Sequence, residues 1–172
     1  INTNTIRFGY PNGVNPAVVG VRGIQNASIP TTLNINDNII EGIAGVPIAG
    51  TSETNFIINN TTTATATVNT NGNIIRNFER TGASGTMYGI RIIANNWTAN
   101  GNTIDNLKWS NINATGEIFA IQNFGASTTN IYSNNIISNL TTATTGAIVG
   151  IRDVSAGAKT ANGNTISNFT KV

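Results

Sequence analysis

The stretches Asn102-Thr103-Ile104-Asp105-Asn106-Leu107 and Asn135-Ile136-Ile137-Ser138-Asn139-Leu140 are two copies of one pattern, in which an Asn precedes a Thr-Ile or Ile-Ile pair. The same Asn anchor occurs six times along the chain, at Asn4, Asn38, Asn73, Asn102, Asn135 and Asn164. Successive anchors are 34, 35, 29, 33 and 29 residues apart. A repeat of this period indicates an architecture in which each unit packs on the next one.

Two further apolar segments accompany the anchors. One reads Val19-Gly20-Val21-Arg22, Phe56-Ile57-Ile58-Asn59, Tyr88-Gly89-Ile90-Arg91, Phe119-Ala120-Ile121-Gln122 and Val149-Gly150-Ile151-Arg152. The other precedes the next anchor and contains Leu33 and Ile35, Val68, Trp97, Ile131 and Ala161. Each repeat therefore predicts three short strands and no helix. Since a unit of this size cannot bury its own apolar face, we expect an all-β parallel solenoid of about five three-stranded coils, 29–35 residues each.

The composition supports this fold and excludes several kinds of site. Of the 172 residues, 30 are Asn, 26 Thr and 26 Ile. Ile and Thr favour strands, whereas Asn suits corners because it tolerates left-handed backbone and its amide can bond the same amide one coil above. The chain has no His and no Cys, which excludes the usual zinc sites, His-based catalysis and disulfides. We expect no metal and no cofactor.

Charge and hydropathy restrict the partners. Only 16 residues are charged, with a net charge of +2, so the surface is nearly neutral and rich in amides. This is not the basic footprint of a nucleic-acid-binding protein, and no nucleic-acid partner is expected. No apolar run approaches the roughly 18 residues of a membrane span.

Equivalent positions of stacked coils form columns along the axis. The position three after the anchor is expected to point outward, and its column reads Arg7, Glu41, Arg76, Asp105, Ser138 and Ser167. Glu41 and Asp105 would lie about 9.6 Å apart, which is near the spacing of the two acids of an inverting glycosidase. A ladder of ion pairs is the favoured interpretation, because Arg76 would fill the space that a sugar and a water molecule need.

The Asn-x-Ile-x-Asn-Leu/Phe pattern of the two opening stretches resembles the right-handed parallel β-helix repeat of the pectin-lyase-like superfamily. The resemblance covers essentially the whole chain. It implies right-handed winding and an extracellular or cell-surface location. Because the superfamily includes polysaccharide lyases and hydrolases, phage tailspikes, ice-binding proteins and the stalks of bacterial surface adhesins, the resemblance is specific for the fold and leaves the function open.

Candidates for glycan contact come from a second outward column and from the two tryptophans. The column reads Arg22, Asn59, Arg91, Gln122 and Arg152, so that Arg alternates with amides. Lyases of the superfamily use an Arg beside a calcium site of clustered acids, but no residue here matches their catalytic or calcium motifs, and no catalytic residue is predicted. Arg91 and Arg152 are candidates for contact with an anionic glycan. Trp97 and Trp109 are candidates for sugar stacking, although packing in the core or at its rim is the favoured interpretation for both.

A threonine array of the ice-binding type is not predicted. Such a surface needs Thr-x-Thr in register over several coils, and the one good run, at 61–67, is confined to a single coil. The counterparts of this run around Trp97 and Lys159 lack it.

We expect residues 1–172 to form one unit, without an atypical polar coil at either end. Such a unit is either part of a longer repeat chain or a subunit that assembles end to end. The predicted function is a non-enzymatic stalk or adhesin segment, secreted or on the cell surface, whose partners are other copies or flanking coils and, as a further candidate, glycans. The alternative is a carbohydrate-active β-helix with its site partly outside these residues. Convergence of Asp153, Glu117 and an Arg in one groove would favour the alternative.

Overall fold

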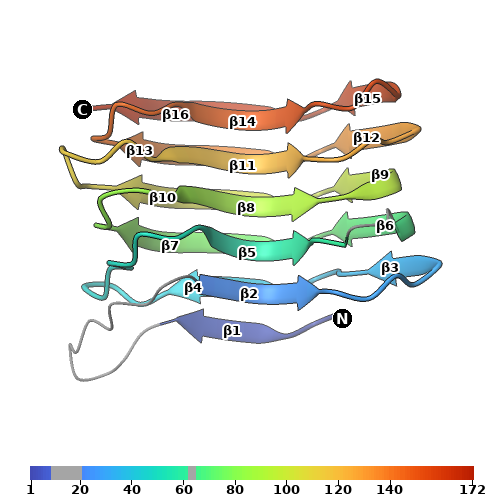
Figure 1. Ribbon diagram of the computed structural model, residues 1–172, viewed down its shortest axis with the longest axis horizontal. Helices are drawn as coiled ribbons and strands as arrows, with labels where there is room; N and C mark the ends of the chain where they lie inside the picture. The colour runs from blue at the N-terminus through green and yellow to red at the C-terminus, as the bar shows by residue number, and fades with distance from the viewer. Residues whose placement is uncertain (9–20, 62–64) are drawn as a thin grey trace.

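The computed structural model describes residues 1–8, 21–61 and 65–172, which form a stack of about five coils (Figure 1). Every strand pair is parallel, and the strands belong to three sheets that run along the stack. The predicted all-β parallel solenoid is therefore confirmed. The described residues contain no helix, and accordingly none that is long and apolar enough to cross a membrane.

Each coil contributes one strand to each sheet. The first sheet contains β1 (Thr5–Phe8), β4 (Ile39–Gly42), β7 (Ile74–Arg80), β10 (Thr103–Trp109), β13 (Ile136–Thr142) and β16 (Thr165–Lys171). The second sheet contains β2 (Val21–Asn26), β5 (Thr54–Asn59), β8 (Thr86–Ile92), β11 (Glu117–Asn123) and β14 (Ile148–Asp153). The third sheet contains β3 (Thr32–Asn34), β6 (Thr65–Asn71), β9 (Ala94–Asn100), β12 (Thr129–Ser133) and β15 (Ala158–Asn162).

The core lies between the three sheets and is built from columns of equivalent side chains. The Ile two residues after the anchor forms one such column, and Ile40, Ile75, Ile104 and Ile137 are all fully buried. Phe78, Leu107 and Leu140 form a second buried column of the first sheet. Burial of these columns requires the neighbouring coils, because each strand supplies only one side chain to each column.

Left-handed backbone turns the chain at two corners of the coil. The residue before the anchor has positive φ in all six copies, and it is Gly72, Gly101 or Gly163 in three of them. The second corner is the Asn four residues after the anchor, with positive φ at Asn77, Asn106, Asn139 and Asn168. Gly and Asn adopt this conformation at the lowest cost, which explains why the sequence repeats them here.

The six anchor residues form a continuous amide ladder inside the stack. Each Nδ2 group donates to the Oδ1 atom of the anchor one coil further on, at 2.8–3.0 Å, from Asn4 through to Asn164. Each of these Oδ1 atoms also accepts the backbone N–H of the preceding anchor. The predicted amide pairing between coils is thus confirmed along the whole stack.

Two register predictions are wrong. In the second sheet Arg22 pairs with Asn55 and Asn59 with Ile92, so the column that holds Arg91 begins with Gln25 and Ile58 instead. The error arises because the first copy resembles the x-Gly-Ile-Arg pattern in two frames, at residues 19–22 and 22–25, and the second copy has neither the Gly nor the Arg. Val19 and Gly20 lie outside the described residues. In the third sheet Asn130, not Ile131, pairs with Trp97 in the inward column, and Ile131 is 36% exposed. Polar partners hold Asn130 inside the stack.

Candidate functional site

The charged column of the first sheet has the predicted register. Glu41 lies between Arg7 and Arg76, with nitrogen–oxygen distances of 2.6 and 2.8 Å. The hydrogen bonds from Arg7 and then Arg76 lower the pKa of Glu41 below its ordinary value. A carboxylate held ionised between two guanidinium groups is poorly suited to donate a proton.

Asp105 does not extend this ladder of ion pairs. Its Oδ1 atom accepts hydrogen bonds from Ser138 Oγ and Asn139 Nδ2, both at 2.7 Å. In the described part of the chain no Lys or Arg nitrogen lies within ion-pair distance of Asp105, although Arg76 is its neighbour in register. The ladder expected from the sequence therefore consists of Arg7, Glu41 and Arg76 alone.

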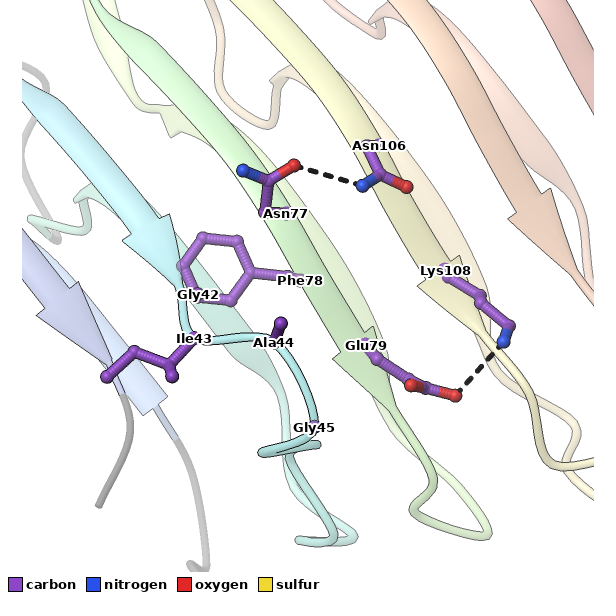
Figure 2. A pocket seen from close by; sticks show the side chains of 9 residues that line it. All are labelled: Gly42, Ile43, Ala44, Gly45, Asn77, Phe78, Glu79, Asn106 and Lys108. Atoms are coloured by element: carbon purple, nitrogen blue, oxygen red, sulfur yellow. Dashed lines mark hydrogen bonds and ion pairs between the residues drawn. The ribbon is translucent and has the colours of Figure 1, made fainter. Parts of the chain in front are cut away.

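A groove opens beside this column, where β4 ends early (Figure 2). β4 pairs with β7 only from Ile39 to Glu41. The chain then leaves the sheet through residues 43–47 and returns at Ile48, whose N–H donates to the Glu79 carbonyl. The edge of β7 between these two contacts faces the groove. The early end of β4 at Gly42 was not visible in the repeat spacing.

The groove presents two amides and one ion pair to solvent. Asn106 Nδ2 donates to Asn77 Oδ1 at 3.0 Å, and Lys108 Nζ lies 3.2 Å from Glu79 Oε1. A hydrogen bond from Ser110 and the charge of Lys108 lower the pKa of Glu79, against the effect of its partial burial. Glu79 is the one acid among the described lining residues, so the paired carboxylates of a glycosidase are not assembled there.

Arg91 lies on the outer face of the second sheet, between aromatic rings. Its guanidinium carbon is 4.5 Å from the centre of the Tyr88 ring and 4.4 Å from that of Phe124, and Nη1 pairs with Glu53 at 2.8 Å. The Arg91 side chain is only 13% exposed. Its charge and its planar face are therefore already occupied by partners of this chain.

Arg152 lies two coils further along the same column and is exposed. It stacks on Phe119 at 5.1 Å, and Phe119 stacks in turn on Tyr88 at 5.6 Å. Gln122 separates Arg152 from Arg91 in the column and is almost fully buried. Of the two Arg candidates for glycan contact, only Arg152 offers an accessible guanidinium group.

Trp97 and Trp109 are both buried and belong to the core cluster. Trp97 Nε1 donates to Thr70 Oγ1, and Trp109 Nε1 donates to the Gly82 carbonyl, each at 2.9 Å. Neither ring offers a face to a sugar in this structure. Both tryptophans therefore pack in the core, as the favoured interpretation of the sequence expected.

Arg80 is a buried cation that the sequence analysis missed. Its guanidinium donates to the carbonyls of Gly50, Ser52 and Ser84 and to Thr54 Oγ1, and it stacks on Trp109 at 4.5 Å. Burial lowers its pKa to about 10. Because carbonyls from two loops converge on one side chain, Arg80 fixes the loops beside β5 and β8 to the stack.

Asp153 forms a polar cluster at the C-terminal end of the core. Its carboxylate accepts hydrogen bonds from Asn123, Asn130, the Tyr132 hydroxyl and the Ser155 backbone N–H, at 2.8–3.2 Å. Burial alone would raise the pKa of Asp153, but the hydrogen bonds from Ser155, Tyr132 and Asn130 lower it below the ordinary value. Glu117 is not among these partners. All four donors are neutral, and they leave the carboxylate oxygens well satisfied.

The described residues contain no group of three or more acids that could hold a metal ion. No family model, no curated protein and no solved structure matches the chain.

Proposed function

We propose that this chain is a structural element, a rigid β-helical rod that acts as a stalk or adhesin segment on the cell surface or in a secreted protein. The observation that carries the proposal is the amide ladder, which links every coil to the next without a break from Asn4 to Asn164. A side chain held this way cannot change rotamer without breaking buried hydrogen bonds, so the ladder opposes sliding and bending of the coils.

The edge of the last strand, β16, is suited to pair with a further β-helical coil. Among the described residues β16 pairs with β13 alone, and Ile166 and Phe169 are exposed at 48% and 36%. A further coil with an Asn anchor, from a flanking segment or another copy, would extend both the sheet and the ladder. We also propose that the chain is a member of the pectin-lyase-like superfamily, which its sequence resembles, and that its coils wind to the right.

The rod can be tested by measuring its length in solution. Because the chain has no Cys, Thr5→Cys and Thr165→Cys place two spin labels at the exposed opposite ends of one column of the first sheet. Five strand spacings separate these positions, which predicts about 24 Å. Deleting 135–163 joins Asn134 to Asn164 and removes one coil, and the distance should then fall to about 19 Å with an equally narrow distribution. A broad distribution, or an unchanged distance in the deletion variant, would contradict a rigid rod.

The carbohydrate-active alternative predicts a different result. Under that alternative the protein that carries these residues depolymerises a polysaccharide, and Glu41→Gln or Glu79→Gln abolishes the activity. Arg152→Ala tests whether the chain binds a glycan without cleaving it, since this substitution removes the accessible guanidinium and leaves the core intact. Turnover of any polysaccharide that depends on one of these acids would replace the structural proposal.

A further inference from the structure

The corner that precedes the anchor contains an Asn-Gly pair in three of the described coils. The pairs are Asn71-Gly72, Asn100-Gly101 and Asn162-Gly163, and a fourth, at residues 12–13, lies outside the described residues. In each of the three, the Asn ends a strand of the third sheet and the Gly has a φ of 63–65°. Since the pairs share their local sequence and their glycine conformation, a difference in their reactivity must arise from the neighbouring coils.

An Asn-Gly pair can modify itself without a cofactor. The backbone nitrogen of the Gly attacks the side-chain carbonyl carbon of the Asn and gives up its proton, and the side-chain nitrogen leaves as ammonia. Water then opens the cyclic imide at one of its two carbonyls, which yields Asp or isoaspartate. Gly favours this reaction because it has no Cβ to hinder the ring. The reaction requires that the peptide plane between the two residues turns and that the Gly N–H loses its proton.

Two neighbouring coils hold this peptide plane at the inner pairs. The Asn100 carbonyl accepts the Gly72 N–H at 2.9 Å. On the other side of the same plane, the Gly101 N–H donates to the Ser133 carbonyl, also at 2.9 Å. The plane between residues 71 and 72 is bonded on both sides in the same way. Turning either plane, or removing the proton of its Gly, breaks a hydrogen bond between coils, so pairing suppresses the reaction.

The pair in the last coil is held on one side only. The Asn162 carbonyl accepts the Asn134 N–H at 2.9 Å. Gly163 lies between β15 and β16 at the C-terminal end of the stack, and among the described residues no acceptor pairs with its N–H (Figure 1). Both residues of the pair are exposed, but exposure does not distinguish them, because Asn100 and Gly101 are exposed too. The difference between the pairs is the missing hydrogen bond of the attacking nitrogen.

The side chain of Asn162 is also less restrained than its counterparts. Asn71 Oδ1 accepts the Asn100 N–H, and Asn100 Oδ1 accepts from Asn134 Nδ2, each at 3.1 Å. Within the described part of the chain, the amide of Asn162 forms no such bond to a further coil. The group that is attacked is therefore as free to turn as the nitrogen that attacks it.

We propose that Asn162-Gly163 is a site of spontaneous deamidation and that a coil stacked on β16 suppresses the reaction. Isoaspartate adds one carbon to the backbone directly before the Asn164 anchor, whose Oδ1 accepts the N–H and the Nδ2 group of Asn135. The modification thus disturbs the last step of the amide ladder and the edge of β16. Suppression by a further coil rests on the proposed function, whereas the reactivity of the pair in this chain does not.

Peptide mapping by mass spectrometry follows the reaction at each pair in the intact, folded chain. Trypsin places the three pairs in separate peptides, residues 23–76, 92–108 and 160–171. We expect deamidation in peptide 160–171 to be at least about tenfold faster than in the other two, because the open edge of a sheet fluctuates most. In urea, which removes the contacts between coils, the three rates should become similar.

Asn162→Ser is the matched control, because Ser133 occupies the equivalent position one coil earlier. This substitution should abolish the fast reaction in peptide 160–171 and leave the slow reaction at Asn71 and Asn100 unchanged. Circular dichroism establishes that the fold is retained. In the folded chain, a rate at Asn162 no higher than that at Asn100 would overturn the inference, and so would a fast product that persists in the Ser variant.

A duplicated coil tests the suppression. A second copy of residues 135–163, inserted after Gly163, yields two identical Asn-Gly pairs, of which the inner one faces the added coil. Trypsin separates them, since the inner pair is followed by the second copy of Asn135 and the outer pair by Asn164. We expect the inner pair to react at least about tenfold more slowly than the outer one. Equally fast reaction of both would overturn suppression by stacking, without affecting the result for the unmodified chain or the distance measurement that tests the rod.

Discussion

At the scale of single residues, the anchor asparagines have the largest expected effect on stability. Asn102 Oδ1 accepts both the N–H and the Nδ2 group of Asn73, and its own Nδ2 donates to Asn135 Oδ1 and the Thr70 carbonyl. Asn102→Leu removes all of these bonds and leaves the partners buried. At ~1–3 kcal/mol for each unsatisfied group, the free energy of unfolding should fall by at least about 3 kcal/mol.

Urea denaturation measures this loss, and Asn113→Ala is the control. Asn113 is exposed in a loop, and its hydrogen bond to the described residues is donated by its backbone N–H to Asn111 Oδ1. The control should change the free energy of unfolding by less than about 0.5 kcal/mol. Equal effects of the two substitutions would show that the ladder contributes no specific stability.

Asp153 predicts a pH dependence. Since its folded pKa lies below the ordinary value, the ionised carboxylate stabilises the fold above pH about 4, and this contribution disappears as the pH falls through the folded pKa. Asp153→Asn should therefore be less stable than the parent at neutral pH, because an amide cannot accept all four donors. The gap should narrow below pH about 4.

Thermal unfolding at several pH values provides the comparison. Asp37→Asn is the matched control, since Asp37 is exposed and has positive φ, which Asn tolerates. If the stability gap between Asp153→Asn and the parent stays constant from neutral to acid pH, the hydrogen-bonded carboxylate is not the cause.

At the scale of elements, several strands of the first sheet contain an Asn with left-handed backbone conformation. Asn106 has φ of 51° in the middle of β10, and its side chain makes one exposed hydrogen bond to Asn77. Asn106→Gly keeps the backbone conformation and loses only that bond, whereas Asn106→Ala also introduces left-handed strain. The Ala variant should be about 1 kcal/mol less stable than the Gly variant, as chemical denaturation would measure. If Ala is as stable as Gly, the corner is not under conformational strain.

At the scale of the whole molecule, stability rests on burial and on bonds between coils, and little on surface charge. The described residues form four ion pairs, and each has a partner that is at least 44% exposed. Exposed pairs contribute roughly 0–1 kcal/mol each and weaken as salt screens them. Adding 1 M sodium chloride, about ten times the usual ionic strength, should therefore change the free energy of unfolding by less than about 2 kcal/mol. A larger loss in urea titrations would mean that the charged column holds the coils together.

The sequence by itself determined the solenoid, its period, the inward Ile column and the amide ladder. Each of these features is a repeat of one residue type at one position, such as the Asn of Asn102 and Asn135, and stacking makes equal positions into neighbours. The corners could also be predicted, because Gly101 and Asn134 are residues that accept left-handed backbone.

Only the tertiary structure decided the exact register and the surfaces that depend on it. A shift of one residue exchanges the two faces of a strand, and in β12 the polar partners of Asn130 placed Ile131 outside. The groove beside Glu79 and the carbonyls that accept hydrogen bonds from Arg80 lie in loops that differ between coils. The repeat pattern therefore could not predict them.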